Sequence, residues 1–498
     1  DLIDRGLEIG GTPPGIAAAD LSVQTAIDGE VNLVSTAGVD LLFWDGGNAG
    51  LHNNGSIDGG GGIWEAANGN WTDKDGALNG AMKPMPGFAV FQGAAGTLAV
   101  DDGSGTISVT GMQFAADGYA IEGGAIELVG AGGKSVIRVG IGSAAGADYT
   151  ATIASSLTGA GSLIKTDLGK LVLSGANSYQ GGTSILQGNL VAAVTGALGT
   201  GPVVIDGGDL AFANSASADT LAITNRTNLA FRQASSAGAA AVVNTGRINF
   251  YDTTSAQDAT IVNDGAGTSF NDNSTAGNAT IRNSGGGTLA FYGAATADAA
   301  TIINNSGGFT RFLDNSTADD AAIVNGPGGV VEISGLTTAG IGIGSMSGNG
   351  DVYLGSRTLT LGELERSDRI GGVIQDGGSA GGTGGSLVKT GAGTLTLTGA
   401  NIYTGLTTVN GGTLSIGGGG TTGSIASNSA IATGGTLAFD RSDSLGYSGT
   451  LSGAGDFIKH GGGILTLTGD RAAFAGDSTI AAGALRVCGS LGGTLNVR

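Results

Sequence analysis

Residues 260–291 read TIVNDGAGTSFNDNSTAGNATIRNSGGGTLAF and contain one phrase twice. The phrase is an apolar residue, any residue and Asn, at 261–263 and 281–283, and a Phe follows each Asn after seven or eight residues. Working outward, the Asn spacing is 19, 19, 20, 21 and 21 along Asn225, Asn244, Asn263, Asn283, Asn304 and Asn325. A matching Phe follows the first five of them, at Phe231, Phe250, Phe270, Phe291 and Phe312. A period of about 20 residues predicts a repeat architecture.

A repeat of this length fits one coil of a parallel β-solenoid. Each coil supplies short strands that pair with the coils before and after it, so equivalent residues stack about 4.8 Å apart. We therefore expect the Phe side chains to line the interior and the Asn side chains to hydrogen-bond along the stack. A helical fold is disfavoured, because no long segment has apolar residues at i, i+3, i+4 and i+7, and each Gly costs a helix about 1 kcal/mol relative to Ala.

The composition excludes several protein classes. The chain has 498 residues, of which 100 are Gly and only 12% are charged. Ordinary globular domains have roughly 7% Gly and about 25% charged residues, so a conventional large enzyme core is disfavoured. The chain is 40% hydrophobic and has 6 Pro, which excludes a disordered chain and a collagen triple helix.

The charge argues against two kinds of partner. The chain has 21 Lys and Arg against 41 Asp and Glu, a formal charge of −20, which repels nucleic acids and anionic lipid surfaces. We therefore expect no nucleic-acid partner. The sequence shows no run of about 18 apolar residues, and it begins Asp-Leu-Ile-Asp-Arg without a basic and apolar leader. We expect either that such segments are absent or that the chain is an excised piece.

A second, longer repeat occurs three times, starting at residues 161, 385 and 455. Each copy has a Lys followed ten residues later by a Gly, at Lys165, Lys389 and Lys459. The first two copies continue with Ala-Asn-x-Tyr-x-Gly and end in Gly-x-Leu at 188–190 and 412–414. The phrase Leu-Thr-Leu-Thr in the later copies alternates with period two, which is typical of a half-buried strand between Gly turns.

This pattern resembles the autotransporter-associated β-strand repeat. That repeat belongs to the secreted passenger regions of type V (classical) autotransporters of Gram-negative bacteria. Two departures are visible. Asp167 stands where the family usually has Gly, and the third copy has one extra residue and lacks the Asn-x-Tyr phrase.

The resemblance implies an all-β fold: a single elongated parallel β-helix (right-handed β-solenoid) with an irregular N-terminal cap. It implies a location on the bacterial outer membrane surface or outside the cell, after export through the periplasm. It also implies a signal peptide and a C-terminal membrane β-barrel that lie outside this chain.

Residues 1–92 differ from the rest of the chain. They hold all three Trp and four of the six Pro. Because the end coil of a solenoid exposes unpaired strand edges, we interpret 1–92 as an N-terminal cap with the first irregular coils. Residues 93–220 are then solenoid with the first long repeat, 221–335 the Asn/Phe ladder coils, and 336–498 solenoid with the second and third long repeats.

Few residues suggest catalysis. His52 and His460 are over four hundred residues apart, so a solenoid is not expected to bring them into one site. The Gly-Asp-Ser phrase at 476–478 resembles that of serine hydrolases, but the Gly expected after the Ser and a nearby His are missing, so we interpret it as a turn before a strand. Cys488 can form no intramolecular disulfide because it is the single cysteine, and it is expected to be a small buried strand residue rather than a nucleophile.

Charged residues at predicted turns also have a simple explanation. Acidic residues can bind Ca²⁺ or act as an acid/base pair, but solvation at turns explains them better, as at Asp73, Asp75, Asp101, Asp102, Asp319 and Asp320. Asp298 is another turn residue, and its truncation to Ala is expected to cost under about 0.5 kcal/mol. The repeat lysines are equivalent by position, which indicates a structural role. No catalytic, metal or cofactor site is predicted.

The Trp residues are the candidate ligand-binding residues. Exposed indoles at Trp44, Trp64 and Trp71 could stack on sugar rings, but packing within the cap explains these residues better.

We interpret the chain as a contact protein and not an enzyme. As an adhesin or host-interaction (virulence) factor, it would bind host cell surfaces, extracellular matrix or neighbouring bacteria, besides its own membrane β-barrel. Two alternatives stay open, because a fold does not fix a function. One is a polysaccharide lyase or glycosidase on the same scaffold, and the other is a released ligand of a host receptor.

Overall fold

The computed structural model describes residues 21–24, 32–35, 41–425, 428–489 and 493–497. Its regular elements are β-strands, apart from two short 3-10 helices, η2 (Ala131–Gly133) and η3 (Ala144–Gly146). Within these ranges, no helix has the length and apolar character that crossing a membrane requires. The chain divides into two units, Asp1–Ala241 and Val242–Arg498.

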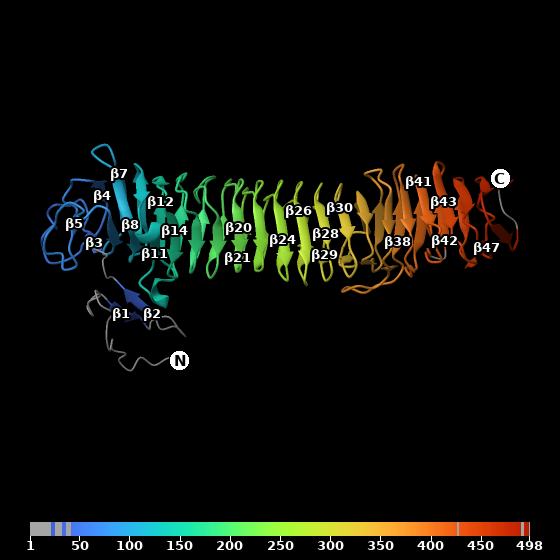
Figure 1. Cartoon of the computed structure of the whole chain (residues 1–498), viewed down its shortest axis with the longest axis horizontal. Coiled ribbons are helices and arrows are strands. Elements are labelled where there is room, and N and C mark those ends of the chain that lie inside the picture. Colours follow the sequence, from blue (N-terminus) through green and yellow to red (C-terminus); the bar gives the residue numbers. More distant parts are fainter. Residues whose placement is uncertain (1–20, 25–31, 36–40, 426–427, 490–492, 498) are drawn as a thin grey trace. The chain divides into compact units, whose positions relative to one another are not determined.

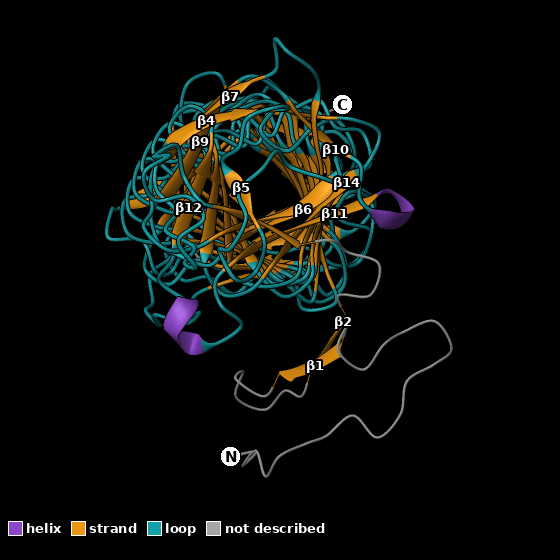
Figure 2. Cartoon of the chain, turned by 90° about the vertical axis from the view of Figure 1, so that its left-hand side faces the viewer, coloured by secondary structure: helices purple, strands orange, loops and turns teal. Residues whose placement is uncertain are grey.

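Unit 1 (Asp1–Ala241) is built on two parallel sheets, and Figure 2 shows their first strands end-on. The first contains β3 (Leu41–Trp44), β6 (Gly87–Phe91), β8 (Ile107–Phe114), β10 (Ile126–Leu128), β11 (Lys134–Val139), β13 (Leu157–Thr158), β14 (Ser162–Thr166), β16 (Thr183–Ile185), β18 (Val203–Ile205) and β20 (Ala222–Asn225). The second contains β4 (Gly62–Glu65), β7 (Thr97–Asp101), β9 (Tyr119–Gly123), β12 (Thr150–Ile153), β15 (Lys170–Leu173), β17 (Asn189–Ala192), β19 (Asp209–Phe212) and β21 (Asn228–Phe231).

Three short strands of unit 1 pair differently. β1 (Leu21–Gln24) and β2 (Asn32–Ser35) form an antiparallel pair, and β5 (Trp71–Thr72) pairs antiparallel with β3. The parallel pairing already includes β3 with β6, so it begins inside the segment 1–92 that was predicted as the cap. Residues 1–20, 25–31 and 36–40 of that segment lie outside the described residues.

Unit 2 (Val242–Arg498) also consists of stacked parallel strands (Figure 1). Its first sheet contains β24 (Thr260–Asp264), β26 (Thr280–Ser284), β28 (Thr301–Asn304), β30 (Ala322–Asn325) and β33 (Ser345–Ser347). Its second contains β23 (Arg247–Phe250), β25 (Gly267–Phe270), β27 (Thr288–Phe291), β29 (Phe309–Phe312), β31 (Val330–Glu332), β34 (Asp351–Tyr353) and β37 (Ile374–Gln375). β22 (Ala241–Asn244) contains the boundary of the units.

The later coils of unit 2 form three further parallel sheets. One contains β32 (Gly340–Ile343), β35 (Thr358–Leu361), β38 (Ser386–Lys389), β40 (Leu406–Val409), β42 (Asn428–Ile431) and β45 (Leu451–Gly453). The next contains β36 (Asp368–Ile370), β39 (Thr394–Leu397), β41 (Gly412–Ile416), β43 (Gly435–Asp440), β46 (Asp456–His460), β48 (Ser478–Ile480) and β50 (Leu495–Val497). The last contains β44 (Leu445–Tyr447), β47 (Ile464–Leu467) and β49 (Ala484–Val487).

The predicted Phe ladder fills the interior of unit 2. Phe250, Phe270, Phe291 and Phe312 pair in register and are fully buried. Successive ring centroids are 4.5, 5.0 and 5.0 Å apart, and the ring planes lie within 10° of parallel. The strand spacing therefore sets the ring spacing, as expected for identical residues on successive coils.

The predicted Asn ladder is equally regular. The side-chain amide of each Asn donates to the next Asn carbonyl oxygen, over 2.8 Å from Asn244 to Asn263, 2.9 Å from Asn263 to Asn283, 2.9 Å from Asn283 to Asn304 and 3.3 Å from Asn304 to Asn325. These amides are buried, and a buried polar group is costly unless it is hydrogen-bonded. The ladder satisfies that requirement from coil to coil.

Two stacks of Ala, which the sequence analysis did not predict, fill another corner of the same coils. All eight side chains are fully buried, at Ala256, Ala259, Ala276, Ala279, Ala297, Ala300, Ala318 and Ala321. The small side chain lets the backbone turn tightly there without leaving a void. The all-β fold of stacked parallel coils is thus confirmed in each unit.

Candidate functional site

The three Trp side chains pack on one another. Trp44, Trp64 and Trp71 are at most 1% exposed. The ring centroids are 5.3 Å apart for Trp44 and Trp71 and 5.1 Å apart for Trp64 and Trp71, edge to face, and Phe91 extends the cluster. This is a favourable aromatic arrangement. The three indoles are therefore not exposed, and the packing within the cap that the sequence favours is what the structure has.

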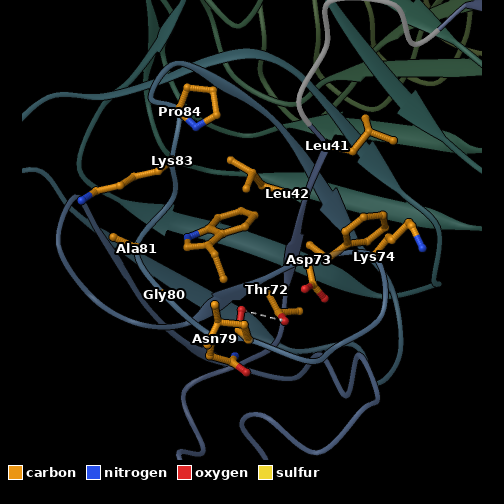
Figure 3. A pocket seen from close by; sticks show the side chains of 13 residues that line it. Leu41, Leu42, Thr72, Asp73, Lys74, Asn79, Gly80, Ala81, Lys83 and Pro84 are labelled. Atoms are coloured by element: carbon orange, nitrogen blue, oxygen red, sulfur yellow. Dashed lines mark hydrogen bonds between the residues drawn. The ribbon is translucent and has the colours of Figure 1, made fainter. Parts of the chain in front are cut away.

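A hollow of about 650 Å³ lies beside this cluster (Figure 3). Its walls come from β3, β5 and the segment that follows β5, and they combine apolar and charged side chains: Leu41, Leu42, Leu78, Pro84, Asp73, Lys74 and Lys83. Of the three Trp, Trp71 lines the hollow, and its indole N–H is buried without an acceptor. The hydroxyl of Thr72 donates to the carbonyl of Leu78 over 3.2 Å and holds the segment in place. Such a mixture suits a small amphipathic ligand.

Two charges at the rim keep their ionised forms. The backbone N–H of Ala77 donates to Asp73, which lowers the pKa of that carboxyl. A hydrogen bond to Asp75 raises the pKa of Lys74. These charges are paired with local groups. From the sequence, only a turn was predicted for this segment.

The three repeat lysines are buried and bind backbone carbonyl groups. Nζ of Lys165 donates to the carbonyls of Thr166, Asp167 and Gln187 over 2.9, 2.8 and 3.2 Å. The other two copies repeat this arrangement one for one, two carbonyls coming from the residues just after the Lys and one from the next coil. An ammonium group has three donors, so each lysine is fully satisfied. The predicted structural role is thereby explained.

Burial shifts the titration of these lysines. It lowers the pKa of Lys165 to about 7, with the nearby Asp167 acting in the opposite direction. Burial likewise lowers the pKa of Lys389 and of Lys459. A lowered lysine pKa is typical of Schiff-base chemistry, but here each Nζ faces main-chain oxygens rather than a cavity, at 0 to 2% residue exposure.

The long repeats share a second internal network. The carbonyl of Asn177 accepts from Leu157 N over 2.7 Å, and its amide donates to Ala197 O over 2.5 Å. Asn401 makes the equivalent bonds to Ile374 N and Ser424 O. Each of these amides therefore ties its own coil to the coils on both sides.

The third copy lacks this network because its sequence departs from the repeat pattern. Arg471 stands where the other copies have Asn; one of its nitrogens donates to the carbonyl of Cys488 over 2.6 Å, while Nε and Nη1 are buried without a partner. Ser478, the Ser of the Gly-Asp-Ser phrase, is fully buried in this copy and its hydroxyl has no partner. A buried hydroxyl in the wall of a coil is not reachable by a substrate.

The remaining candidates are the two histidines and Cys488. Nε2 of His52 lies 2.9 Å from the carbonyl of Gly46 in unit 1, whereas His460 ends β46 in unit 2. Cys488 is exposed and follows β49, so the prediction of a buried strand residue is wrong.

The predicted turn carboxylates act locally. Asp75 pairs with Lys74 at 2.8 Å, Asp101 accepts from Gly103 N, Asp102 from Ala125 N, and Asp319 from the hydroxyls of Thr296 and Thr317. Over the part of the chain that the structure describes, no three His, Cys, Asp or Glu side chains are grouped so as to hold a metal ion.

The three long repeats match a known protein family. Residues 163–192, 387–416 and 457–487 match the family of the passenger-associated-transport-repeat. Each match begins two residues before one of the three repeat lysines. It also includes the residue of the next coil whose carbonyl that lysine binds. No solved structure matches the chain.

The chain is also similar to a curated autotransporter adhesin. The chain is 48% identical over 191 residues to the "Adhesin BmaC autotransporter" of Brucella suis biovar 1 (strain 1330). This alignment covers 37% of the chain and 6% of the relative, so the chain spans a small fraction of the relative's length.

Proposed function

We propose that this autotransporter passenger region, built on β-strand repeats, acts by contact as an adhesin or host-interaction factor and not as an enzyme. It lies at the bacterial outer membrane surface or outside the cell. The observation that carries the proposal is its 48% identity with an autotransporter adhesin over 191 residues. The partners would be host cell surfaces, extracellular matrix or neighbouring bacteria, together with the translocating membrane domain of its own protein.

The internal chemistry of the repeats supports a scaffold role. Several polar groups that would be reactive on a surface lie inside the coils. The three lysines and the two Asn amides hydrogen-bond to main-chain groups, and Ser478 is buried. What remains for recognition is the outer surface. We propose the predicted division into 1–92, 93–220, 221–335 and 336–498 as its working description, with the hollow of Figure 3 as one contact point.

The test is attachment by the purified chain. Fluorescently labelled protein should bind saturably to epithelial cells, to immobilised matrix proteins or to bacteria of the same strain, and unlabelled protein should compete. The same preparation should give no multiple turnover on a panel of polysaccharides, esters and peptides. Turnover abolished by one conservative carboxylate substitution would overturn the proposal, and so would the absence of saturable attachment to all three surfaces.

A further inference from the structure

A shallow groove crosses the outer surface of the second sheet in unit 2. It encloses about 560 Å³ and runs over β23, β25, β27 and β29. In each of these strands the second and fourth residues are buried, so the first and third face outward, as the alternation of a β-strand requires. The groove is therefore formed by residues that take no part in the Phe ladder.

The floor of the groove consists of small residues. Gly267 and Ser269 of β25 pair in register with Thr288 and Ala290 of β27. The half-buried Tyr292, which follows β27, contributes an aromatic ring to the lining. A depression thus lies where two successive coils have small outward side chains and their neighbours have larger ones.

An Arg stands at each end of the groove. The exposed Arg247 belongs to β23 and Arg311 to β29, three strand spacings or about 14 Å farther along the sheet. The guanidinium carbon of Arg311 lies 5.7 Å from the ring centroid of Phe309, which fixes its direction. Within the described residues, Arg311 has no ion-pair partner within 4 Å, and its Nε is buried without an acceptor.

The charge of the groove is opposite to that of the chain. The residues that line it include two Arg and no Asp or Glu, although the chain carries a formal charge of −20. Glu332 on the next strand pairs in register with Arg311 and its charge acts on that guanidinium, but the two form no ion pair within 4 Å, and the carboxylate accepts hydrogen bonds from Ser334 and Ser379. A local positive groove on an acidic protein selects for a short anionic ligand, while a long polyphosphate is repelled by the rest of the surface.

We propose that this groove binds an anionic oligosaccharide, with its carboxylate or sulfate groups on Arg247 and Arg311. Guanidinium groups bind such oxyanions through paired hydrogen bonds. The Thr288 hydroxyl can donate to or accept from a sugar hydroxyl, and the Tyr292 ring offers an apolar face. The Ser269 hydroxyl donates to Asn249 Oδ1 over 3.0 Å, so these two side chains present oxygen acceptors to the groove. The assignment rests on the proposed contact function and names the ligand class for it. The outward residues differ from coil to coil, so no sequence period marks them.

The test uses the full chain and two charged probes. A heparin-derived tetrasaccharide carries sulfates and an oligogalacturonate tetrasaccharide carries carboxylates, and neutral maltotetraose serves as the reference in calorimetric titrations at low and at physiological salt. The groove variants are the double substitution Arg247→Gln and Arg311→Gln, and Gly267→Trp, since a Cβ at Gly267 meets only the Thr288 hydroxyl, at 3.3 Å. Arg282→Gln is the matched control, because Arg282 is exposed on β26 of the other sheet.

We expect saturable binding of at least one charged probe, about tenfold or more weaker in both groove variants and unchanged in Arg282→Gln. Undiminished binding in the groove variants, equal weakening by Arg282→Gln, or no binding of either charged probe would overturn the proposal. Cell attachment is measured on the same proteins. If the parent chain and the groove variants attach equally well, the groove is not the binding site but the contact function is supported. If the parent chain does not attach, the contact function is contradicted, whatever the result with the probes.

Discussion

The hydroxyl groups of Tyr179 and Thr183 lie 2.6 Å apart inside the first long repeat, both fully enclosed by their coil. Tyr403 and Thr407 repeat this contact at the same distance in the second copy. In the third copy the corresponding residues, again four apart, are Phe474 and Ser478. The Ser hydroxyl is left without a partner because the aromatic residue has lost its own hydroxyl.

Phe474→Tyr should therefore stabilise the chain. The new hydroxyl would satisfy Ser478, and a satisfied buried hydroxyl is worth about 1 kcal/mol. Urea unfolding followed by far-ultraviolet circular dichroism would show a higher midpoint. Tyr403→Phe is the converse control and should lower the midpoint by a similar amount. A lower midpoint for Phe474→Tyr would mean that the third copy does not share the geometry of the other two.

The repeat lysines should be essential to the coils that contain them. Lys165→Met keeps the length and apolar stem of the side chain but leaves the carbonyls of Thr166, Asp167 and Gln187 without their donor. The loss of hydrogen bonds to a charged group predicts destabilisation by about 3 kcal/mol. Lys170→Met, at an exposed position in the next strand, should change the unfolding free energy by less than about 0.5 kcal/mol. Equal effects of the two substitutions would contradict the assigned role.

The turn at Asp298 is more demanding than its sequence indicates. Its φ is +50°, in the left-handed region, and the equivalent residue one coil earlier is Gly277 with φ +58°. Asp tolerates this region better than Ala does, and the left-handed conformation costs most other residues about 1–2 kcal/mol. We therefore revise the expected cost of Asp298→Ala upward to about 1 kcal/mol. Asp298→Gly should be close to neutral, and thermal unfolding of both variants measures the difference; an Ala variant as stable as the Gly variant would contradict the revision.

The sequence was sufficient for the parts of the fold that recur coil after coil. Asn263 and Phe270 could be placed in register because each repeats with a constant spacing, and Lys165 could be assigned a structural role because it recurs in three copies. The three carbonyls that Lys165 binds were not predictable, since backbone groups leave no mark in a sequence.

Features that occur once were harder to predict. Trp71 could be exposed or buried on the same sequence evidence, and only the packing of three indoles decides it. Cys488 follows a short alternating phrase that suggests a buried position, yet it lies beyond the end of β49 and is exposed. Arg247 and Arg311 flank a groove only because small residues occupy the coils between them, which is a three-dimensional relationship.

Glu332 connects two segments that are far apart in the sequence, and this contact should depend on pH. The residue ends β31 with 4% of its surface exposed, and its carboxylate accepts from the hydroxyls of Ser334 and Ser379 over 2.5 and 2.6 Å, and from the backbone N–H of Ser379. Burial alone would raise its pKa, but the hydrogen bonds from Ser334 and Ser379, aided by Arg311, outweigh burial and lower the pKa. At its other end the segment 376–385 is held by Asp376, which accepts from Gly385 N over 2.9 Å.

The sign of the pH effect follows from that lowered pKa. The contribution of Glu332 is fully present above the pKa of an unfolded Glu, about 4.3, and is lost as the pH falls through the lower value of the folded protein.

Hydrogen exchange of peptides covering 376–385 measures this contribution directly, when it is followed by mass spectrometry at a series of pH values and corrected for intrinsic rates. At pH 7, Glu332→Gln should speed exchange about tenfold, since hydrogen bonds to charged groups contribute about 1.5–3 kcal/mol. The parent and the variant should converge only when the pH falls below the lowered pKa of Glu332 in the folded protein. Glu363→Gln, at an exposed position, is the control and should follow the parent at every pH. A difference between parent and Glu332→Gln that persists unchanged in acid would show that the segment is held by packing and not by the carboxylate.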